Sequence, residues 1–176
     1  FERAPFDTIR VTMLNEDGEY FGVFGSGGSE DGGFRWPCGI AIDNHNHVYV
    51  TDEQLHRISV FTESGQFIKH WGSQGVDEGM LDGPSGIVID QDNNVLISDS
   101  KNHRIQKVTK RGKYIDSWGS FGDGAGQFNL PYGIAVDEED FVYVTDWRND
   151  RVQKFTGEGE FVFELSLIHI SEPTRR

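Results

Sequence analysis

The sequence has little cysteine, few basic residues and no long apolar run. Its one cysteine, Cys38, cannot form a disulfide within the chain. No apolar stretch approaches the roughly 20 residues of a membrane-spanning helix, which argues against a span. Lys and Arg total 16 against 29 Asp and Glu, for a formal net charge of −13. Nucleic-acid binders need a basic surface to displace counterions from phosphate, so this balance argues against RNA or DNA as the main partner.

Glycine, by contrast, is frequent, with 22 among 176 residues, and apolar residues make up 36%. This mixture is typical of one domain in which many short strands are joined by glycine turns. No segment carries a sustained helical period. The composition therefore favours an all-β fold.

One unit of 47 residues recurs along the chain, as Pro37, Pro84 and Pro131 show. The same interval relates several other sets, namely Gly39, Gly86 and Gly133; Asp43, Asp90 and Asp137; Asp52, Asp99 and Asp146; Arg57, Arg104 and Arg151; Gly65, Gly112 and Gly159. The dipeptide Trp71-Gly72 returns as Trp118-Gly119, and one step back the series continues at Gly18 and Phe24-Gly25. A constant period of this length indicates a repeat architecture.

Each unit contains four strand-like segments, in which β-branched and aromatic residues alternate with others. The first unit has them at residues 39–42, 47–51, 57–61 and 66–71, separated by Asp, Asn, Ser and Gly turns. The next two units repeat them at residues 87–89, 95–98, 104–108 and 114–118, then at 134–136, 142–145, 151–155 and 160–163. Four antiparallel strands at this repeat length are typical of a β-propeller blade. A solenoid is the alternative, although its repeats are usually shorter and its strands parallel.

The stretches at residues 37–61, 84–108 and 131–155 resemble NHL repeats. The second contains Asn102-His103 followed by Ile105, close to the Asn-His-Leu core that names the family. The resemblance covers residues 10–164 and implies a ring of about six blades. We therefore predict an all-β propeller of four-stranded antiparallel blades, of which this chain holds about three and a half. The predicted half blade spans about 9–25, and the blades span about 38–72, 85–119 and 132–164.

The string LSLIHISEPTR at residues 165–175 resembles a translated sequencing adapter. A step of 47 residues from Gly119 predicts glycine at position 166, where Ser166 stands. The repeat pattern thus fails where this string begins. We expect residues 1–164 to form the partial propeller and residues 165–176 to be a non-native tail.

The recurrent Asp and Arg residues suit a structural role better than a catalytic one, because a catalytic site is needed once and these residues occur in every unit. We interpret them as Asp turns and Asp–Arg hydrogen bonds that hold each blade or its neighbour. They are Asp52, Asp99, Asp146, Arg57, Arg104 and Arg151. Trp71 and Trp118 are expected to pack on the outer strands.

Binding is expected where the units differ. In an antiparallel blade the second strand ends on the face where the first begins, so the second-to-third strand loops share a face with the connections between blades. Loops carry binding more often than strands do. The candidate binding residues in these loops are Leu55, His56, Lys101, His103, Trp147, Arg148 and Asp150. The apolar side chains of Leu55 and Trp147 are the candidate anchors.

A metal-dependent enzyme is the first alternative. His45 and His47 form His-x-His beside Asp43, but a metal site needs a further convergent ligand, and the other units lack these histidines. The NHL-like amidating lyases carry zinc-binding His in the slot after the repeated Pro, which here holds Cys38, Ser85 and Tyr132. Gluconolactonase-like propellers bind a divalent metal through channel carboxylates. We predict no catalytic residue and no cofactor, with a divalent metal at His45 and His47 as the minor alternative.

The second alternative is a substrate-recognition or RNA-binding propeller of a tripartite-motif-like ubiquitin ligase, since in those NHL proteins a RING module precedes a propeller that sometimes binds RNA. The single cysteine leaves no RING in this sequence, and the acidic charge disfavours RNA. The main prediction is a propeller scaffold that binds a protein or a small ligand, through the face formed by the second-to-third strand loops and the connections between blades.

Overall fold

The computed structural model describes residues 9–166, and their regular secondary structure is almost entirely β-strand. Three antiparallel sheets have four strands each, and every strand pairs with its neighbour in sequence. The first sheet contains β5 (Pro37–Ile42), β6 (Val48–Asp52), β7 (Arg57–Phe61) and β8 (Phe67–Trp71). The second contains β9 (Pro84–Ile89), β10 (Val95–Asp99), β11 (Arg104–Val108) and β12 (Tyr114–Trp118). The third contains β13 (Pro131–Val136), β14 (Val142–Asp146), β15 (Arg151–Phe155) and β16 (Phe161–Ser166).

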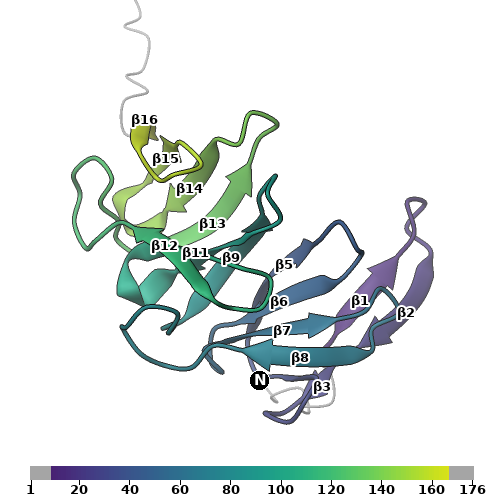
Figure 1. Cartoon of the computed structure of the whole chain (residues 1–176). Coiled ribbons are helices and arrows are strands. Elements are labelled where there is room, and N and C mark those ends of the chain that lie inside the picture. The colour runs from purple at the N-terminus through teal and green to yellow at the C-terminus, as the bar shows by residue number, and fades with distance from the viewer. Residues whose placement is uncertain (1–8, 167–176) are drawn as a thin grey trace, which may run out of the picture.

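A two-stranded half blade precedes these sheets. It pairs β1 (Val11–Leu14) with β2 (Tyr20–Phe24), which correspond to the third and fourth strands of the repeat. The first connection contains the short parallel pair β3 (Ser26–Gly27) and β4 (Gly33–Phe34). Figure 1 shows the half blade and the three blades in succession around a common centre. The predicted fold class, about three and a half four-stranded propeller blades, is confirmed.

Between residues 9 and 166, helix is confined to two single 3-10 turns, η2 (Ser100–Asn102) and η3 (Trp147–Asn149), in second-to-third strand loops. Within residues 9–166 no helix is long and apolar enough to cross a membrane. The predicted end of the last blade differs by two residues, because β16 continues through Leu165 and Ser166, which pair with Val152 and Arg151. Backbone pairing does not depend on side-chain identity, so a strand can extend past the end of the repeat pattern. Residues 167–176 of the predicted tail lie outside the described residues.

The innermost strands of neighbouring blades approach closely at repeated glycines. A Cβ on Gly39 would lie 2.4 Å from the carbonyl oxygen of Ser85, and one on Gly86 would lie 2.3 Å from that of Tyr132. The Ser85 carbonyl also accepts a hydrogen bond of 2.6 Å from the Thr51 hydroxyl. The repeated Pro-x-Gly therefore has a physical reason, since only glycine leaves room for the backbone of the next blade.

The outer parts of the blades meet through a second repeated contact. We name the contact between the β5–β8 and β9–β12 sheets the first seam, and that between the β9–β12 and β13–β16 sheets the second seam. In the first seam Trp71 covers Gly112, where a Cβ would lie 2.7 Å from the indole ring. In the second seam Trp118 covers Gly159 in the same way, at 2.5 Å. Both glycines have φ near +80°, which a turn of this kind requires.

The core lies between blades rather than inside any one blade: one cluster lies in each seam, and a third joins the half blade to the first complete blade. The first-seam cluster joins Ile58 and Val60 of one blade to Val95 and Ile97 of the next. The second-seam cluster joins Leu96 and Ile105 to residues of the third blade in the same way. Each connection between blades adds one fully buried side chain, spaced by 47 residues: Phe34, Leu81 and Phe128. Each blade is therefore stabilised mainly by its neighbour.

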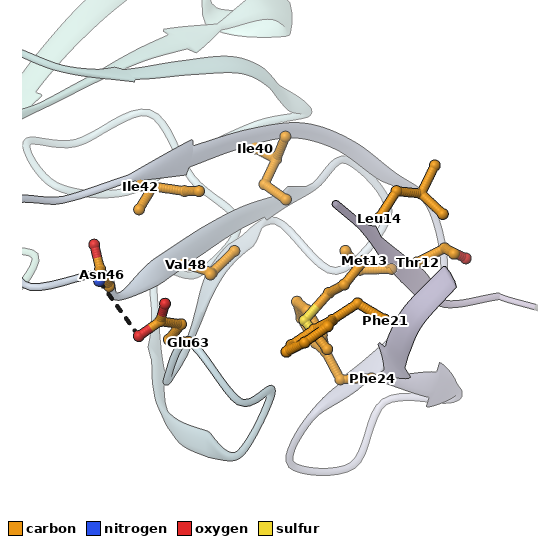
Figure 2. Close-up of a pocket in the computed structure, with 11 residues that line it drawn as sticks. Thr12, Met13, Leu14, Phe21, Phe24, Ile40, Ile42, Asn46, Val48 and Glu63 are labelled. Carbon is orange, nitrogen blue, oxygen red and sulfur yellow. Dashed lines mark hydrogen bonds between the residues drawn. The ribbon is translucent and has the colours of Figure 1, made fainter. Parts of the chain in front are cut away.

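A hollow of about 370 Å³ lies between the half blade and the first complete blade (Figure 2). Ile40 and Ile42 border it from β5 and are more than half exposed. The equivalent residues Ile87 and Ile134 pack against the blade before them. The half blade has no counterparts of the first two strands of the repeat among the described residues, so these isoleucines face an open space.

Candidate binding face

The second-to-third strand loops and the connections between blades lie together, as expected from the antiparallel order. Pro37 pairs with Asp52, Pro84 with Asp99, and Pro131 with Asp146, so each first strand begins beside the end of the second. We name this surface the loop face. It comprises the loops at residues 53–56, 100–103 and 147–150 and the connections at residues 26–36, 73–83 and 120–130.

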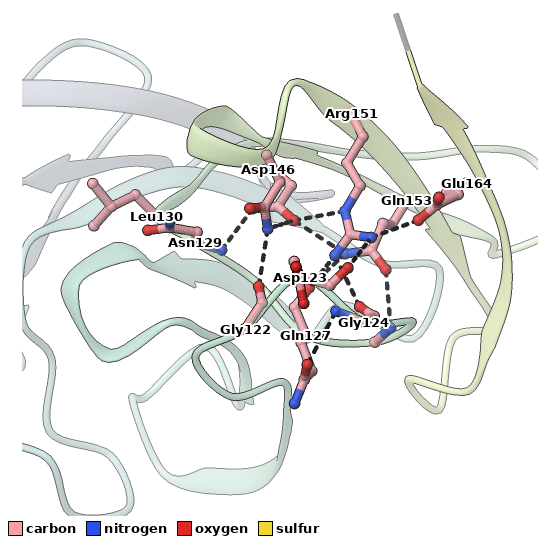
Figure 3. A network of polar contacts seen from close by, with 12 residues as sticks. Gly122, Asp123, Gly124, Gln127, Asn129, Leu130, Asp146, Arg151, Gln153 and Glu164 are labelled. Atoms are coloured by element: carbon pink, nitrogen blue, oxygen red, sulfur yellow. Dashed lines mark hydrogen bonds and ion pairs between the residues drawn. The ribbon is translucent and has the colours of Figure 1, made fainter. Parts of the chain in front are cut away.

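A buried Asp–Arg network lies beneath the loop of the third blade (Figure 3). Asp146 is fully buried, and one carboxylate oxygen accepts the backbone N–H of Asn129 at 2.7 Å. Its other oxygen accepts Nε of Arg151 at 2.9 Å and the amide of Asn149 at 2.8 Å. The remaining nitrogens of Arg151 donate to the carbonyls of residues 123, 124 and 127, and one of them also pairs with the exposed carboxylate of Glu164 at 2.6 Å. The network thus ties the connection at residues 120–130 to the blade that follows it.

The second blade repeats this arrangement. Asp99 accepts the backbone N–H of Asp82 at 2.7 Å and Nε of Arg104 at 2.8 Å. Gln106 donates to the same carboxylate at 3.0 Å, as Gln153 does to Asp146 at 3.4 Å. Charge-assisted hydrogen bonds of this kind hold a loop more firmly than neutral ones.

The first blade departs from the pattern. Asp52 accepts backbone N–H groups from Arg35 at 2.7 Å and Leu55 at 2.9 Å, while Arg57 donates instead to carbonyls of residues 29, 30 and 33. Leu55 and Ser59 stand where the other blades carry the Asn and Gln of the network. As a result, Nε of Arg57 and the Ser59 hydroxyl are buried without a hydrogen-bond partner among the residues that the structure describes.

Several predicted binding residues make contacts within the protein. Nδ1 of His56 accepts the backbone N–H of Gly83 at 3.1 Å, and Nδ1 of His103 accepts that of Leu130 at 3.2 Å. Lys101 forms an ion pair of 3.2 Å with Glu53, and Leu55 is half-buried. These side chains line the loop face, but they also fix its loops.

Trp147 is a predicted binding residue whose side chain is open to solvent. Its side chain is 58% exposed, and the guanidinium carbon of Arg148 lies 4.7 Å from the centre of its ring. Asp150, at the end of the same loop, is exposed. Trp147, Thr145 and Tyr132 line a hollow of about 380 Å³. The loop at residues 147–150 therefore offers an aromatic side chain, a cation and a concave surface together.

The residues directly after the repeated Pro bring further side chains to the hollow beside Trp147. The Tyr132 hydroxyl lies 3.8 Å from Sγ of Cys38, which lies 3.9 Å from a carboxylate oxygen of Glu53. Burial raises the pKa of the Cys38 thiol, which keeps it protonated and unsuited to nucleophilic attack. From the sequence, Tyr132 was considered only as the counterpart of a zinc ligand, and its position beside Trp147 was not predicted. The pairing of Pro131 with Asp146 is the signal that could have placed it there.

Exposed aromatic residues also occur in the connections between blades. Trp36 is 62% exposed and Phe121 is 66% exposed. Both were absent from the predicted binding residues, which came only from the second-to-third strand loops. Their non-recurrence was the available signal, because Ser73–Gly83 carries no aromatic residue.

The His-x-His motif lies on the opposite face. Nδ1 of His47 contacts Asp43 at 3.2 Å, while the ammonium of Lys110 lies 3.4 Å from both Nδ1 of His45 and the Asp43 carboxylate. An ammonium thus lies between two of the groups that would ligate a cation. Within residues 9–166 no group of three or more His, Cys, Asp or Glu side chains is arranged to hold a metal ion.

These features define a β-propeller whose blades are held by recurrent Asp–Arg networks and whose variable residues lie on its loops. The NHL repeat profile matches residues 34–61, 81–108 and 128–155. The chain therefore contains NHL repeats in a β-propeller fold, as the sequence predicted.

Solved propeller structures support the same fold at low identity. Virginiamycin B lyase from Staphylococcus aureus is 17% identical with a TM-score of 0.66, over 94% of this chain and 51% of that one. A streptogramin B lyase is 18% identical with a TM-score of 0.65, over 89% and 47%. Hydrazine synthase of Kuenenia stuttgartiensis is 17% identical with a TM-score of 0.63, over 88% and 42%. This chain spans about half the length of the lyases, and the comparison with curated proteins gives no match.

Proposed function

We propose that this protein is a scaffold that binds a protein or a small ligand through the loop face. The observation that carries the proposal is the exposed Trp147 beside the hollow that it forms with Tyr132 and Thr145. Tryptophan and arginine are enriched among residues that contribute most to binding, and here Arg148 already stacks on the indole ring. A partner that fills the hollow would bury a large apolar area, and the rigid indole ring would lose little conformational entropy.

The position of Trp147 in the repeat supports this role. Glu53 and Ser100 occupy the same position in the other two blades, and both are engaged within the protein. Glu53 pairs with Lys101, and the Ser100 hydroxyl donates to the carbonyl of Pro131. Trp147 instead presents most of its surface outward. The buried Asp146 network directly before it holds the loop in place before binding, which lowers the entropic cost of association.

The enzymatic alternative gains no support from the neighbours. Virginiamycin B lyase and streptogramin B lyase are named for an activity, but identities of 17% and 18% support the fold alone. The acidic charge continues to favour a partner other than nucleic acid.

The test is a comparison of binding partners captured by the immobilised chain and by two variants. Trp147→Ala removes the exposed ring from the loop face. Ile115→Ala removes an exposed apolar side chain from β12, away from the loop face, and serves as the control. We expect proteins or small molecules retained by the original chain to be lost with Trp147→Ala, by at least tenfold, and kept with Ile115→Ala. Equal retention by all three would overturn the proposed role of the loop.

A further inference from the structure

We propose that a hollow on the first seam, on the face opposite to the loop face, binds a small molecule through its phosphoryl group. We name it the seam pocket. It has a volume of about 260 Å³ and lies between two blades. Its polar lining consists of Asp43, His45, His47 and Lys69 from one blade and Lys110 and Arg111 from the next, with Tyr49, Val60 and Ile68 among them.

The seam packing brings these residues together. Trp71 covers Gly112, and this contact sets the turn at residues 109–113 against the preceding blade. The carbonyl of Lys110 then accepts a hydrogen bond of 3.1 Å from the ammonium of Lys69. The ammonium of Lys110 reaches back to the side-chain oxygen of Asn44 at 3.2 Å. Two basic segments about 40 residues apart in sequence thus become one cationic site.

Asp43 supplies the one carboxylate in the lining of the seam pocket, and this group is buried and accepts hydrogen bonds from within the protein. Asp43 is buried, and its Oδ1 accepts the backbone N–H groups of His45 at 2.8 Å and His47 at 2.9 Å. Its Oδ2 accepts the Tyr49 hydroxyl at 3.2 Å. Although burial acts in the opposite direction, these hydrogen bonds and Lys110 hold the pKa of Asp43 well below its usual range. The carboxylate therefore orients the histidine turn, while Lys69 and Arg111 keep uncompensated charge.

That positive charge has no carboxylate partner in the part of the chain that the structure describes. The ion pairs of residues 9–166 include none for Lys69 or Arg111. Burial and the neighbouring charge of Arg111 lower the pKa of Lys69, as expected when like charges are held together. An anion between the two side chains would relieve this repulsion.

The second seam indicates that the cations are not needed for packing. Its residues at the positions of His45, Lys69 and Arg111 are Asp92, Asp116 and Glu158. Trp118 nevertheless covers Gly159 there as Trp71 covers Gly112. Because the same frame forms with acidic residues, the cations of the first seam are free to serve a ligand. In a chain with a formal charge of −13, Lys69, Lys110 and Arg111 nevertheless line one hollow.

The side chains suit a phosphoryl group. Arginine presents a planar fork to two oxygens, and lysine adds a point charge for a third. Each neutral imidazole supplies one N–H donor and one acceptor. The apolar side chains of Val60 and Ile68 border the same hollow, so the rest of a small phosphorylated molecule would have a surface to pack against.

The test is calorimetric titration of the chain with inorganic phosphate at constant ionic strength, with chloride as the reference anion. The informative variant is Arg111→Glu, which installs the charge found at the same position of the second seam. The matched control is Lys113→Glu, which makes the same change in net charge on the same turn but outside the pocket lining. Thermal unfolding of each variant checks that the fold is intact.

We expect phosphate to bind the original chain and the Lys113→Glu variant similarly, and the Arg111→Glu variant at least about tenfold more weakly, since loss of one charge-assisted contact is of that order. Absence of phosphate binding to the original chain overturns the proposal. Equal weakening by both substitutions also overturns it, because binding would then follow net charge rather than the pocket.

Discussion

The first and second seams share the same recurrent packing contacts, which we call the frame, and differ in the charge of the side chains around them. In both, an outer-strand Trp covers a turn glycine of the next blade, and an inner-strand glycine admits the next backbone. Around this frame the first seam carries Lys69, Lys110 and Arg111, whereas the second carries Asp116, Gly157 and Glu158. The contact between blades therefore depends on the recurrent residues, and the bordering positions can change sign without loss of the fold.

The two seams also satisfy their inner aspartate differently. In the second seam Lys107 of the same blade lies 2.8 Å from Asp90, and this pair raises the pKa of Lys107 even though burial opposes the shift. In the first seam Val60 stands at that position, and Lys110 of the next blade lies 3.4 Å from Asp43 instead. The aspartate of the second seam is thus paired with a lysine of its own blade. The aspartate of the first seam is paired with Lys110 of the next blade, on the turn that borders the seam pocket.

We expect the largest loss of stability when a side chain is added to the turn glycines that Trp71 and Trp118 cover. We expect Gly112→Ala and Gly159→Ala each to lower the free energy of unfolding by roughly 2–5 kcal/mol, the sum of a left-handed backbone cost and overpacking against the indole ring. Urea denaturation measures the loss. Gly126→Ala is the control, since its φ is +73° with nothing within 4 Å of the added Cβ, so only the backbone cost of about 1–2 kcal/mol applies. Equal losses at all three positions would mean that the Trp contact does not matter.

The close approach of the inner strands gives the second prediction. Gly86→Ala places a Cβ 2.3 Å from the Tyr132 carbonyl oxygen, and we expect a loss of about 1–3 kcal/mol. Gly133→Ala meets only its own blade, at 3.1 Å from the Thr145 hydroxyl, and should cost less than about 1 kcal/mol. Unfolding midpoints of the two variants provide the measurement, and a larger loss at Gly133 would count against the account of the inner strands.

Substitution of Lys107 and of Lys110 tests how the two seams differ in pairing their buried aspartate. Lys107→Met leaves the buried Asp90 without its ion-pair partner, so we expect a loss of about 1–2 kcal/mol. Lys110→Met removes a longer and more exposed contact with Asp43, and we expect a loss below about 1 kcal/mol. Denaturation of both variants in parallel tests this order, which a greater effect of Lys110→Met would reverse.

The repeat made most of the fold predictable. Each strand was visible several times at an interval of 47 residues, so an ambiguous segment in one unit was resolved by its counterparts. The antiparallel order of the strands then predicted which loops share a face, and the pairing of Pro131 with Asp146 agrees with it. The contact between Trp71 and Gly112 was not predictable, because spacing shows that two residues recur but not that one covers the other.

The candidate sites were less accessible to sequence reasoning. His45 and Lys110 lie 65 positions apart in different blades, and they meet only because the seam packing sets one turn against the other. His56 and His103 looked variable because Asp150 stands in the third unit, yet both accept backbone N–H groups 27 residues further along. A structural residue that is replaced in one unit therefore looks like a variable binding residue in the sequence, although in the structure it holds the loops in place.

The most direct test of the distinction between frame and binding positions compares two adjacent residues, Asp146 and Trp147, by urea denaturation. Asp146→Ala removes the buried carboxylate that binds Nε of Arg151 and leaves this arginine paired only with the part-exposed Glu164, so we predict a loss of about 3–5 kcal/mol. Trp147→Ala removes an exposed ring, and the free energy of unfolding should change by no more than about 0.5 kcal/mol. Comparable losses for the two variants would contradict the account.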